Sequence, residues 1–356
     1  MIDLERLTQA RVLIVKLSSI GDVVQALPVA TALRRRFPRA RITWVVEDWT
    51  APLVVGHRAI DRVIVFPRMG GIPVSWRWLR TFRAATRALR SEPYDVAVDL
   101  QGLLKSSVVA LLSRARWRIG TPYQREGARW VSRPVPRRPG RAHIVHQYLR
   151  AAEFLGASAE PVIFDTPVQP DAMNAVARLL ACMNLGSRAL ITVNPSASTP
   201  TRSWPIAQWA QVVDALADAG TVVLVGSRDQ VARHAEVSMR ARRTPYDLTG
   251  RTTLAELVAL LSRSAIHIAP DTGSAHIAAA LGRPVVGLYG PTFPWRVSPY
   301  GQAEFVVYHG ERCGLGCPQW CVRRRCLRAA APDEVVAQAR RALATACCPP
   351  TRAPCA

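Results

Sequence analysis

The sequence predicts an α/β protein of two parallel-sheet domains that face one cleft, and three observations carry this prediction. Short runs rich in Val and Ile alternate with helical patterns through both halves of the chain. A turn with glycine and aspartate follows a buried run in each half, at Gly21-Asp22 and at Asp271-Thr272-Gly273. The length of 356 residues suits two domains. Ligands of open α/β sheets bind where strands end and the next helix presents unpaired N–H groups, so the two turns suit a donor and an acceptor.

The first half alternates strands and helices. Strands are expected at 12–16, 42–47, 62–66, 95–100 and 116–120, and helices at 23–37, 76–91 and 102–113. This order predicts a parallel sheet with helices on both faces. Pro28 should either kink the first helix or mark its first turn. The segment 122–142, rich in Arg, Pro and Gly, is expected to be a loop.

The second half shows the same alternation of strands and helices. Strands are expected at 190–194, 221–226, 246–249, 265–269 and 284–289, and helices at 205–218, 230–241, 253–263 and 274–281. Proline and glycine punctuate the stretch 155–188, which also contains a short predicted helix at 171–183, so the boundary is expected there. We therefore assign an N-terminal acceptor-binding domain to 1–160 and a C-terminal donor-binding domain to 161–346. The tail 347–356 is expected to be disordered.

The charge balance favours an anionic partner. The chain carries 47 Lys and Arg against 25 Asp and Glu, a formal net charge of +22. Nucleic acid, anionic lipid or a phosphorylated glycan would suit this excess, whereas the alternative is arginine-rich coding without a specific ligand. No stretch reaches the roughly 18 uncharged apolar residues of a membrane helix. Asp3 and Glu5 make the start unlike a signal peptide, so the cytoplasm is the expected compartment.

The first turn offers a candidate base. Asp22 at a strand-to-helix corner could accept a proton from a sugar hydroxyl, or it could be an N-cap. The helix dipole would lower its pKa and weaken it as a base. Lys16, Ser18 and Ser19 place further polar groups in the same turn, which favours a functional site.

The second turn offers a candidate phosphate site. Thr272 and Ser274 could donate to phosphate oxygens while Gly273 allows close approach, or the turn could be an ordinary helix start. His276 follows one turn later and could point at this site or be structural. In the polar loop 194–205, Arg202 could clamp a diphosphate with its forked donors, or it could be a surface arginine.

Helix 76–91 has one basic face. Arg80, Arg83, Arg87 and Arg90 recur at helical spacing without acidic partners. Such a stripe is either a solvated face or an attractor for an anionic partner.

Four of the eight cysteines are closely spaced. Cys313, Cys317, Cys321 and Cys326 could hold zinc or iron, although their spacing is not that of an ordinary zinc knuckle. The alternative is free thiols in a loop, because cytosolic cysteines are usually reduced.

Together the motifs resemble those of a known family. The run from Val12 to Asp22, followed by Ala26-Leu27-Pro28, resembles the opening of the bacterial ADP-heptose:lipopolysaccharide heptosyltransferases, glycosyltransferase family 9. The segments 99–106, 202–205, 271–276 and 289–292 resemble their later motifs. The resemblance runs from about 11 to 345 and is closest to heptosyltransferase I, which adds the first heptose. Family members often carry Lys where Arg202 stands, and the cysteine cluster is commoner in second-heptose enzymes and in iron-binding relatives that glycosylate proteins.

The resemblance implies a GT-B fold, with two Rossmann-like domains facing a central cleft, and an inverting, metal-independent transfer from ADP-heptose to Kdo-lipid A. Asp22 would be the general base. The enzyme would act in the cytoplasm, peripheral on the inner face of the inner membrane. It would require no cofactor, and the cysteines could hold a structural zinc or iron. The donor would be bound by Ser198, Arg202, Asp271, Thr272, Gly273, Ser274 and His276. The acceptor would be bound by Ser19, Gly21, Lys105 and Arg125, with Arg80, Arg83 and Arg87 on the basic helix.

Other functions stay open at this point. A heptosyltransferase II-like enzyme, a protein heptosyltransferase or a nucleotide-sugar epimerase could use the same fold, but an epimerase would leave the basic helix unexplained. A nucleic-acid-binding protein is motivated by charge alone, since the sequence shows no recognition motif and no aromatics interleaved on the stripe, so no nucleic acid is expected.

Overall fold

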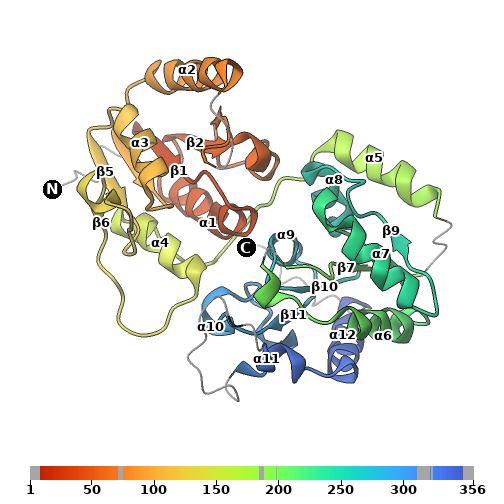
Figure 1. Cartoon of the computed structure of the whole chain (residues 1–356). Coiled ribbons are helices and arrows are strands. Elements are labelled where there is room, and N and C mark those ends of the chain that lie inside the picture. The colour runs from red at the N-terminus through yellow and green to blue at the C-terminus, as the bar shows by residue number, and fades with distance from the viewer. Residues whose placement is uncertain are drawn as a thin grey trace. The chain divides into compact units, whose positions relative to one another are not determined.

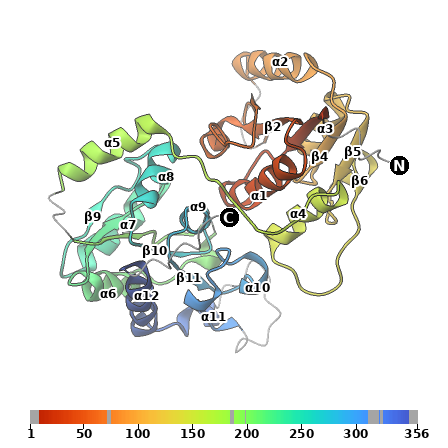
Figure 2. The same cartoon turned by 180° about the vertical axis from the view of Figure 1, so that it is seen from behind.

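Two compact units make up the chain, which divides between Pro167 and Val168 (Figures 1 and 2). This point lies inside the stretch 155–188 where proline and glycine cluster. The structure is a computed structural model and describes residues 9–70, 75–183, 188–197, 199–310, 321 and 324–347.

The first unit is built on a parallel six-stranded sheet with the order β3-β2-β1-β4-β5-β6. Its strands are β1 (Arg11–Val15), β2 (Arg41–Glu47), β3 (Arg62–Phe66), β4 (Val96–Asp99), β5 (Trp117–Gly120) and β6 (Arg133–Pro134). Successive residues of β1 pair in register with β2 from Arg11↔Arg41 and with β4 from Val12↔Val96. This arrangement places the first strand at the centre of the sheet, so the turn that follows it lies among neighbouring strand ends.

Helices cover this sheet. They are α1 (Ile20–Arg36), α2 (Trp76–Arg90), α3 (Leu104–Leu112) and α4 (Ile144–Phe154), with single turns η2 (Asp48–Leu53) and η3 (Ala128–Trp130). Residues of α2 and α3, including Leu89 and Val109, share a core with Leu13 and Val15 of β1. Helix α1 packs against α4, and both lie apart from α2 in Figures 1 and 2.

The second unit repeats this plan with the strand order β12-β11-β10-β7-β8-β9. Its strands are β7 (Leu190–Val193), β8 (Thr221–Leu224), β9 (Tyr246–Asp247), β10 (Ile266–Pro270), β11 (Val285–Tyr289) and β12 (Val306–Tyr308). Its helices are α5 (Pro170–Ala181), α6 (Ile206–Leu216), α7 (Val231–Arg240), α8 (Leu254–Ser262), α9 (Gly273–Ala280), α10 (Pro294–Val297), α11 (Arg325–Arg328) and α12 (Pro332–Cys347), with turns η4 (Pro200–Arg202), η5 (Arg228–Gln230) and η6 (Ala303–Phe305).

One hydrophobic core of the second unit lies between its sheet and helices α6 and α12, and another includes residues of α5 and α8. Trp204 and Trp209 are fully buried in the first of these cores, with ring centroids 5.0 Å apart in an edge-to-face contact. Trp204 therefore anchors the end of the loop 194–205 beneath α6, which fixes where that loop runs.

Every strand predicted from the sequence is present, and the main differences are additions. The sequence analysis did not assign β6, β12, α4, α10, α11 or α12. Helix α1 begins at Ile20, so Pro28 lies well inside it, and the interpretation that Pro28 marks the first turn is wrong. The predicted loop 122–142 also contains η3 and β6. Cys347 is the last residue of α12, and 348–356 lie outside the described residues.

Candidate active site

Asp22 lies in the first turn of α1, directly after the central strand β1. Ser19 is the N-cap, and Asp22 stands at the third helical position of a capping box, so Asp22 helps to cap the helix start without being the N-cap itself. The Ser19 hydroxyl donates to Asp22 Oδ2 at 2.9 Å, and the Ser19 backbone N–H donates to the same oxygen at 3.4 Å. Ile20 and Gly21 lie between them and are the first two residues of the helix. The Asp22 side chain is 43% exposed, so its carboxylate can meet a ligand.

The other oxygen of Asp22 belongs to a relay of three side chains. The buried Lys16 ammonium donates to the Tyr148 hydroxyl at 3.0 Å, and that hydroxyl donates to Asp22 Oδ1 at 2.9 Å. Lys16 Nζ lies 3.9 Å from the same carboxylate oxygen and 4.6 Å from the centre of the Tyr148 ring. One carboxylate oxygen is thus oriented by tyrosine and lysine, and the other by Ser19.

Charge sets the protonation of this relay. Partial burial acts to raise the pKa of Asp22, but the Lys16 charge and the hydrogen bonds from Ser19 and Tyr148 outweigh it and lower this pKa below its ordinary value. Burial lowers the pKa of Lys16, and the charges of Asp22 and Asp99 partly offset that effect. At neutral pH Asp22 is therefore a carboxylate.

A second layer of hydrogen bonds fixes the backbone of the turn. Gln101 Oε1 accepts from the backbone N–H groups of Leu17 and Ser18 at 2.9 and 3.2 Å. Asp99, fully buried at the end of β4, accepts from Gly102 N–H at 2.9 Å and from the Ser106 hydroxyl at 3.0 Å. The motif 99–106 thus holds the loop before Asp22 and the start of α3.

Lys105 lies beside the same turn. Its ammonium donates to Ser18 Oγ at 2.7 Å and forms an ion pair with the buried Glu47 carboxylate at 2.8 Å. Lys105 was predicted to bind the acceptor, and here it contacts protein partners on two sides. Two of its three N–H donors are thus engaged.

The remaining predicted acceptor residues are spread more widely. Arg125 is exposed, and its backbone N–H donates to Gly102 O at 2.8 Å, which places it next to the motif 99–106. Arg80, Arg83 and Arg87 are exposed along α2, which packs on β3 and α3. The structure therefore gathers Ser19, Gly21, Lys105 and Arg125 near Asp22 and leaves the α2 arginines on a separate helix.

In the second unit, α9 begins directly after β10, at the place where the sequence predicted a phosphate site. Thr272 is the N-cap and accepts no hydrogen bond from the helix through its side chain, so the interpretation of an ordinary capped start is not what the structure shows. The Ser274 hydroxyl lies 2.9 Å from Thr272 Oγ1 and 3.0 Å from His267 Nε2. The backbone N–H groups of the first turn have no intrahelical acceptors and can bind an anion.

A buried histidine lies within hydrogen-bond distance of Ser274 in this turn. His267 on β10 is fully buried between Ser274 and Thr192, with 3.0 Å from its Nδ1 to Thr192 Oγ1. Burial lowers the pKa of His267 to about 3, so the ring is neutral at ordinary pH. A neutral ring carries one donor and one acceptor and can orient the Ser274 hydroxyl without adding charge.

Arg202 reaches the start of α9 through Asp271. Arg202 Nη1 lies 3.0 Å from Asp271 Oδ2, and Thr292 Oγ1 donates to that oxygen at 3.0 Å. His276 Nε2 is 3.7 Å from Asp271 Oδ1. Burial acts to raise the pKa of Asp271, but His276, Arg202 and Thr292 outweigh it, so this pKa lies below its ordinary value. The carboxylate engages one edge of the Arg202 guanidinium, which has five N–H donors in all.

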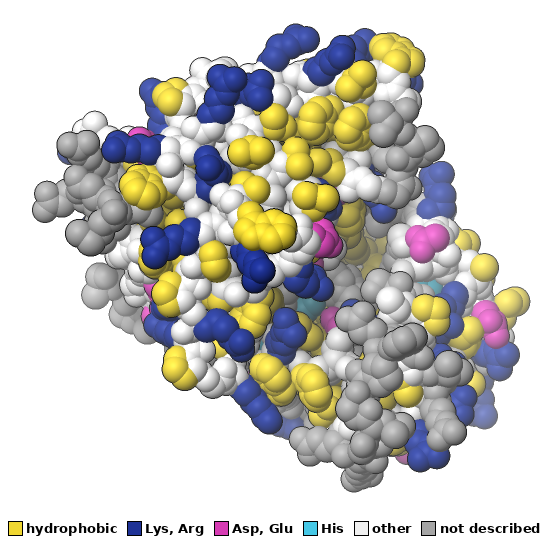
Figure 3. Space-filling view, turned by 60° about the vertical axis from the view of Figure 1, so that its left-hand side comes forward, with side chains coloured by type: hydrophobic (Ala, Val, Ile, Leu, Met, Phe, Trp, Pro, Cys, Tyr) yellow, Lys and Arg dark blue, Asp and Glu magenta, His cyan; other side chains and the backbone are white. Residues whose placement is uncertain are grey.

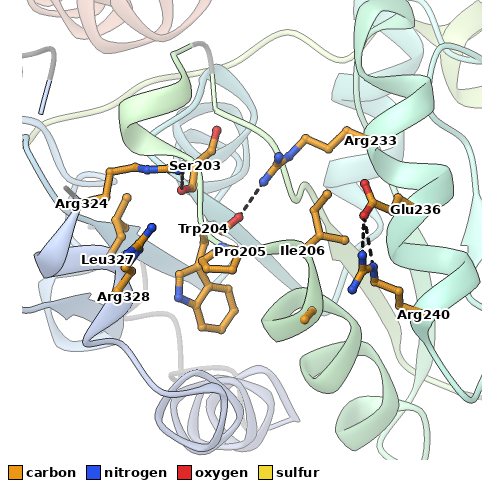
Figure 4. Close-up of a pocket in the computed structure, with 11 residues that line it drawn as sticks. Ser203, Trp204, Pro205, Ile206, Arg233, Glu236, Arg240, Arg324, Leu327 and Arg328 are labelled. Atoms are coloured by element: carbon orange, nitrogen blue, oxygen red, sulfur yellow. Dashed lines mark hydrogen bonds and ion pairs between the residues drawn. The ribbon is translucent and has the colours of Figure 1, made fainter. Parts of the chain in front are cut away.

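Arginines on two further elements brace the loop that carries Arg202. Arg324 Nη1 donates to the backbone oxygens of Pro200 and Ser203 at 3.2 and 3.3 Å, and Arg233 Nη2 donates to Trp204 O at 2.6 Å. They line a hollow of about 390 Å³ that also meets Arg240 and Arg328 (Figure 4). Burial, and then the charge of Arg324, lower the pKa of Arg233. The hollow is therefore electropositive and lies against the Arg202 loop.

Three predicted residues cannot be placed. Ser198, Cys313 and Cys317 lie outside the described residues. Cys326 is buried in the core of the second unit, and Cys321 is partly exposed. Among the described residues no group of three or more His, Cys, Asp and Glu could hold a metal ion. The metal cluster stays a prediction, and elemental analysis of the purified protein would check it, since binding implies near-stoichiometric zinc or iron.

Sequence reasoning missed several residues of both sites. Tyr148 was missed because α4 was not assigned, although its apolar spacing at Val145, Leu149 and Ala152 was a usable signal. Gln101 lies within a quoted motif, but its contacts with Leu17 and Ser18 join segments that follow two neighbouring strands far apart in sequence, so they leave no local pattern. Thr292 likewise lies within a quoted motif. In the sequence His267 has the pattern of a strand residue, and its contact with Ser274 is seen only in the folded structure.

Comparison with known proteins decides the family. The sequence profile described as glycosyltransferase family 9 (heptosyltransferase) matches residues 82–319, which is more than half of the chain. The chain belongs to this family. It is accordingly a glycosyltransferase of the heptosyltransferase type.

Relatives match over most of their length. The chain is 29% identical to lipopolysaccharide heptosyltransferase 1 of Pseudomonas aeruginosa, covering 89% of this chain and 87% of that protein. It is 28% identical to lipopolysaccharide heptosyltransferase 1 of Salmonella typhimurium, covering 85% and 95%. Proteins named heptosyltransferase 3 in Escherichia coli and heptosyltransferase 2 in Haemophilus influenzae also match, each at 25% identity.

Solved structures agree on the fold. The structure of E. coli ADP-heptose lps heptosyltransferase II superposes with a TM-score of 0.76 at 23% identity, covering 94% of this chain and 99% of that chain. The glycosyltransferase family 9 structure from Veillonella parvula gives a TM-score of 0.81 at 20% identity, covering 95% of this chain and 98% of that chain. The two parallel-sheet units are thus the two domains of a GT-B fold, as the sequence predicted.

Proposed function

We propose that this enzyme transfers a heptose from ADP-heptose to the Kdo-lipid A inner core of lipopolysaccharide, with inversion at the anomeric carbon. The observation that carries the proposal is the oriented carboxylate of Asp22 in one unit and the Arg202–Asp271 pair beside the α9 start in the other. The first unit takes the acceptor, and the second takes the nucleotide sugar. Relatives named heptosyltransferase 1 support this acceptor.

The proposed chemistry is a single displacement. The Asp22 carboxylate accepts the proton of the acceptor hydroxyl while that oxygen forms a bond to the anomeric carbon. The bond from this carbon to the diphosphate breaks, and ADP leaves with the electron pair. Arg202 and the N–H groups at the start of α9 stabilise the charge on the leaving diphosphate. We assign no metal to this step, because these groups supply the positive charge.

One experiment tests the donor and the acceptor together. Full-length protein is incubated with ADP-heptose and Kdo-lipid A, and product masses are measured. One added heptose on Kdo-lipid A supports the proposal. Transfer only to an acceptor that already carries a heptose would instead indicate a heptosyltransferase II-like enzyme, and transfer to protein would indicate a protein heptosyltransferase.

The exposed arginines of α2 should help to capture the acceptor from a distance. Lipid A presents phosphates, and Kdo presents carboxylates, so attraction to α2 should fall with salt, which screens charges within about 8–10 Å. We expect Arg80→Gln/Arg87→Gln to raise acceptor KM roughly tenfold at low salt, to flatten its salt dependence and to leave donor KM unchanged.

The matched control removes the same charge elsewhere. Arg178→Gln/Arg242→Gln takes two exposed arginines from the second unit and should leave acceptor KM as it was. If both pairs act equally, or if neither acts, the α2 stripe is a solvated face.

A further inference from the structure

Helix α3 presents an unusual face to solvent. Its exposed residues are Leu104, Val108 and Leu111, which recur at helical spacing and are all aliphatic. Leu104 is 60% exposed and Leu111 is 56% exposed. A surface helix normally turns polar residues outward, so an aliphatic outer face points to a partner that removes it from water.

Exposed tryptophans lie on two elements that contact α3. Turn η3, which contacts α3, carries Trp130 with 82% of the residue exposed, and the Arg129 guanidinium carbon lies 5.7 Å from its ring centre. Helix α2, which also contacts α3, carries the exposed Trp76 as its first residue, with the Arg80 guanidinium carbon 5.0 Å from the ring centre. Tryptophan beside arginine suits a membrane interface, where an apolar ring meets charged headgroups.

The surroundings are strongly basic. Residues 75–140 contain 14 Lys and Arg against four Asp and Glu. Of the arginines next to the aliphatic stripe, Arg114, Arg116, Arg129 and Arg133 are exposed. Figure 3 brings the α3 side of the first unit forward and shows patches of hydrophobic side chains with Lys and Arg around them and few acidic side chains.

We propose that the surface formed by Leu104, Val108, Leu111, Trp130 and Trp76, here called the α3 face, docks on an anionic lipid bilayer. The aliphatic and indole groups would enter the headgroup boundary while the surrounding arginines pair with lipid phosphates. Among the helices that the structure describes, none could span a bilayer.

A second copy of this chain suits the α3 face less well. In a symmetric dimer the same patch meets itself, so the arginines of one protomer would face those of the other. Like charges brought together in this way cost free energy, whereas an anionic bilayer neutralises them. The inference deepens the proposed function, since it rests on an acceptor that is a membrane lipid, but vesicle binding tests it without any enzyme activity.

The test is flotation of full-length protein with phosphatidylcholine vesicles, with and without phosphatidylglycerol and always without acceptor. We expect binding to the anionic vesicles, and a decrease of roughly tenfold in partitioning for Leu111→Ser, here called the leucine variant. Trp130→Ser should weaken binding in the same direction. The control Val231→Ser/Met239→Ser removes two exposed apolar residues from α7 in the second unit and should bind like the parent.

Three results would overturn the proposal. They are absence of binding to anionic vesicles, equal binding by the leucine variant, and parent dimers in sedimentation that the leucine variant abolishes. Turnover on a detergent-dispersed acceptor separates this inference from the proposed function. The leucine variant should keep that turnover, so lost binding with kept activity supports the α3 face, while inactive parent protein that still binds vesicles refutes only the assigned reaction.

Discussion

Asp22→Asn is expected to lower turnover by roughly 10²–10⁴-fold, the usual contribution of a general base. Asparagine keeps an oxygen that can accept from Tyr148 and Ser19, so the turn and donor binding should be retained. What is lost is the basic carboxylate. Steady-state turnover with saturating ADP-heptose and acceptor measures the effect, and circular dichroism checks the fold.

A carboxylate in another helix start provides the control. Asp171 lies exposed in the first turn of α5, and Asp171→Asn should leave turnover unchanged. Near-normal turnover of Asp22→Asn would mean that Asp22 only orders the start of α1 and that the proposed mechanism is wrong.

The pH dependence of turnover gives an independent check on Asp22. Because the pKa of Asp22 is lowered, the carboxylate stays charged into acidic pH, and its protonation should reduce turnover only at a pH below the ordinary range of an aspartate. The same lowering means that Asp22 stabilises the fold above its unfolded pKa, and that this contribution is lost as pH falls through the folded pKa. Lys16 lowers the pKa of Asp22 and so makes its carboxylate a weak base. Proximity of the carboxylate to the acceptor hydroxyl must offset this low basicity.

The strands could be predicted because they are short, apolar and bounded by turn residues. Fully buried parallel strands such as Val12–Val15 read as continuous Val and Ile runs, and the pattern places them without knowledge of their neighbours. The β6 strand could not be found in this way, because it has two residues, both exposed, and exists only through its pairing with β5. Helix α12 was a different case, since Pro332 with Asp333 and Glu334 is a readable helix start.

The site was predictable where its groups are local in sequence. Asp22 and Ser19 are three residues apart, and the order strand, turn, helix already brings them together. Tyr148 lies 126 residues away from Asp22, and its hydroxyl reaches the carboxylate only because α4 packs on α1. The same holds for Lys105, whose ion pair with Glu47 joins the start of α3 to the end of β2. Charged residues and motifs in the sequence thus locate the strand ends. The distant side chains that set the pKa values of the site residues are found only once the helices have packed.

Arg202→Ala is expected to raise donor KM and to lower turnover together, for a combined loss in kcat/KM of roughly one to two orders of magnitude. The diphosphate is charged both in the bound donor and in the transition state, so removing a guanidinium affects both. The Arg202 guanidinium also pairs with Asp271 at 3.0 Å, so the alanine variant leaves that buried carboxylate with Thr292 and His276 as its remaining partners in this contact.

Arg202→Lys distinguishes charge from geometry. Lysine keeps the positive charge but has no planar fork, so it should restore part of the loss if charge on the diphosphate matters most. Acceptor KM should change little in both variants. Arg243→Ala, an exposed arginine that pairs with Asp218 in the same unit, is the matched control and should leave donor KM unchanged. Unchanged kinetics for Arg202→Ala would place the loop 199–203 outside the donor site, and an equal rise in both KM values would indicate general disruption instead of lost diphosphate binding.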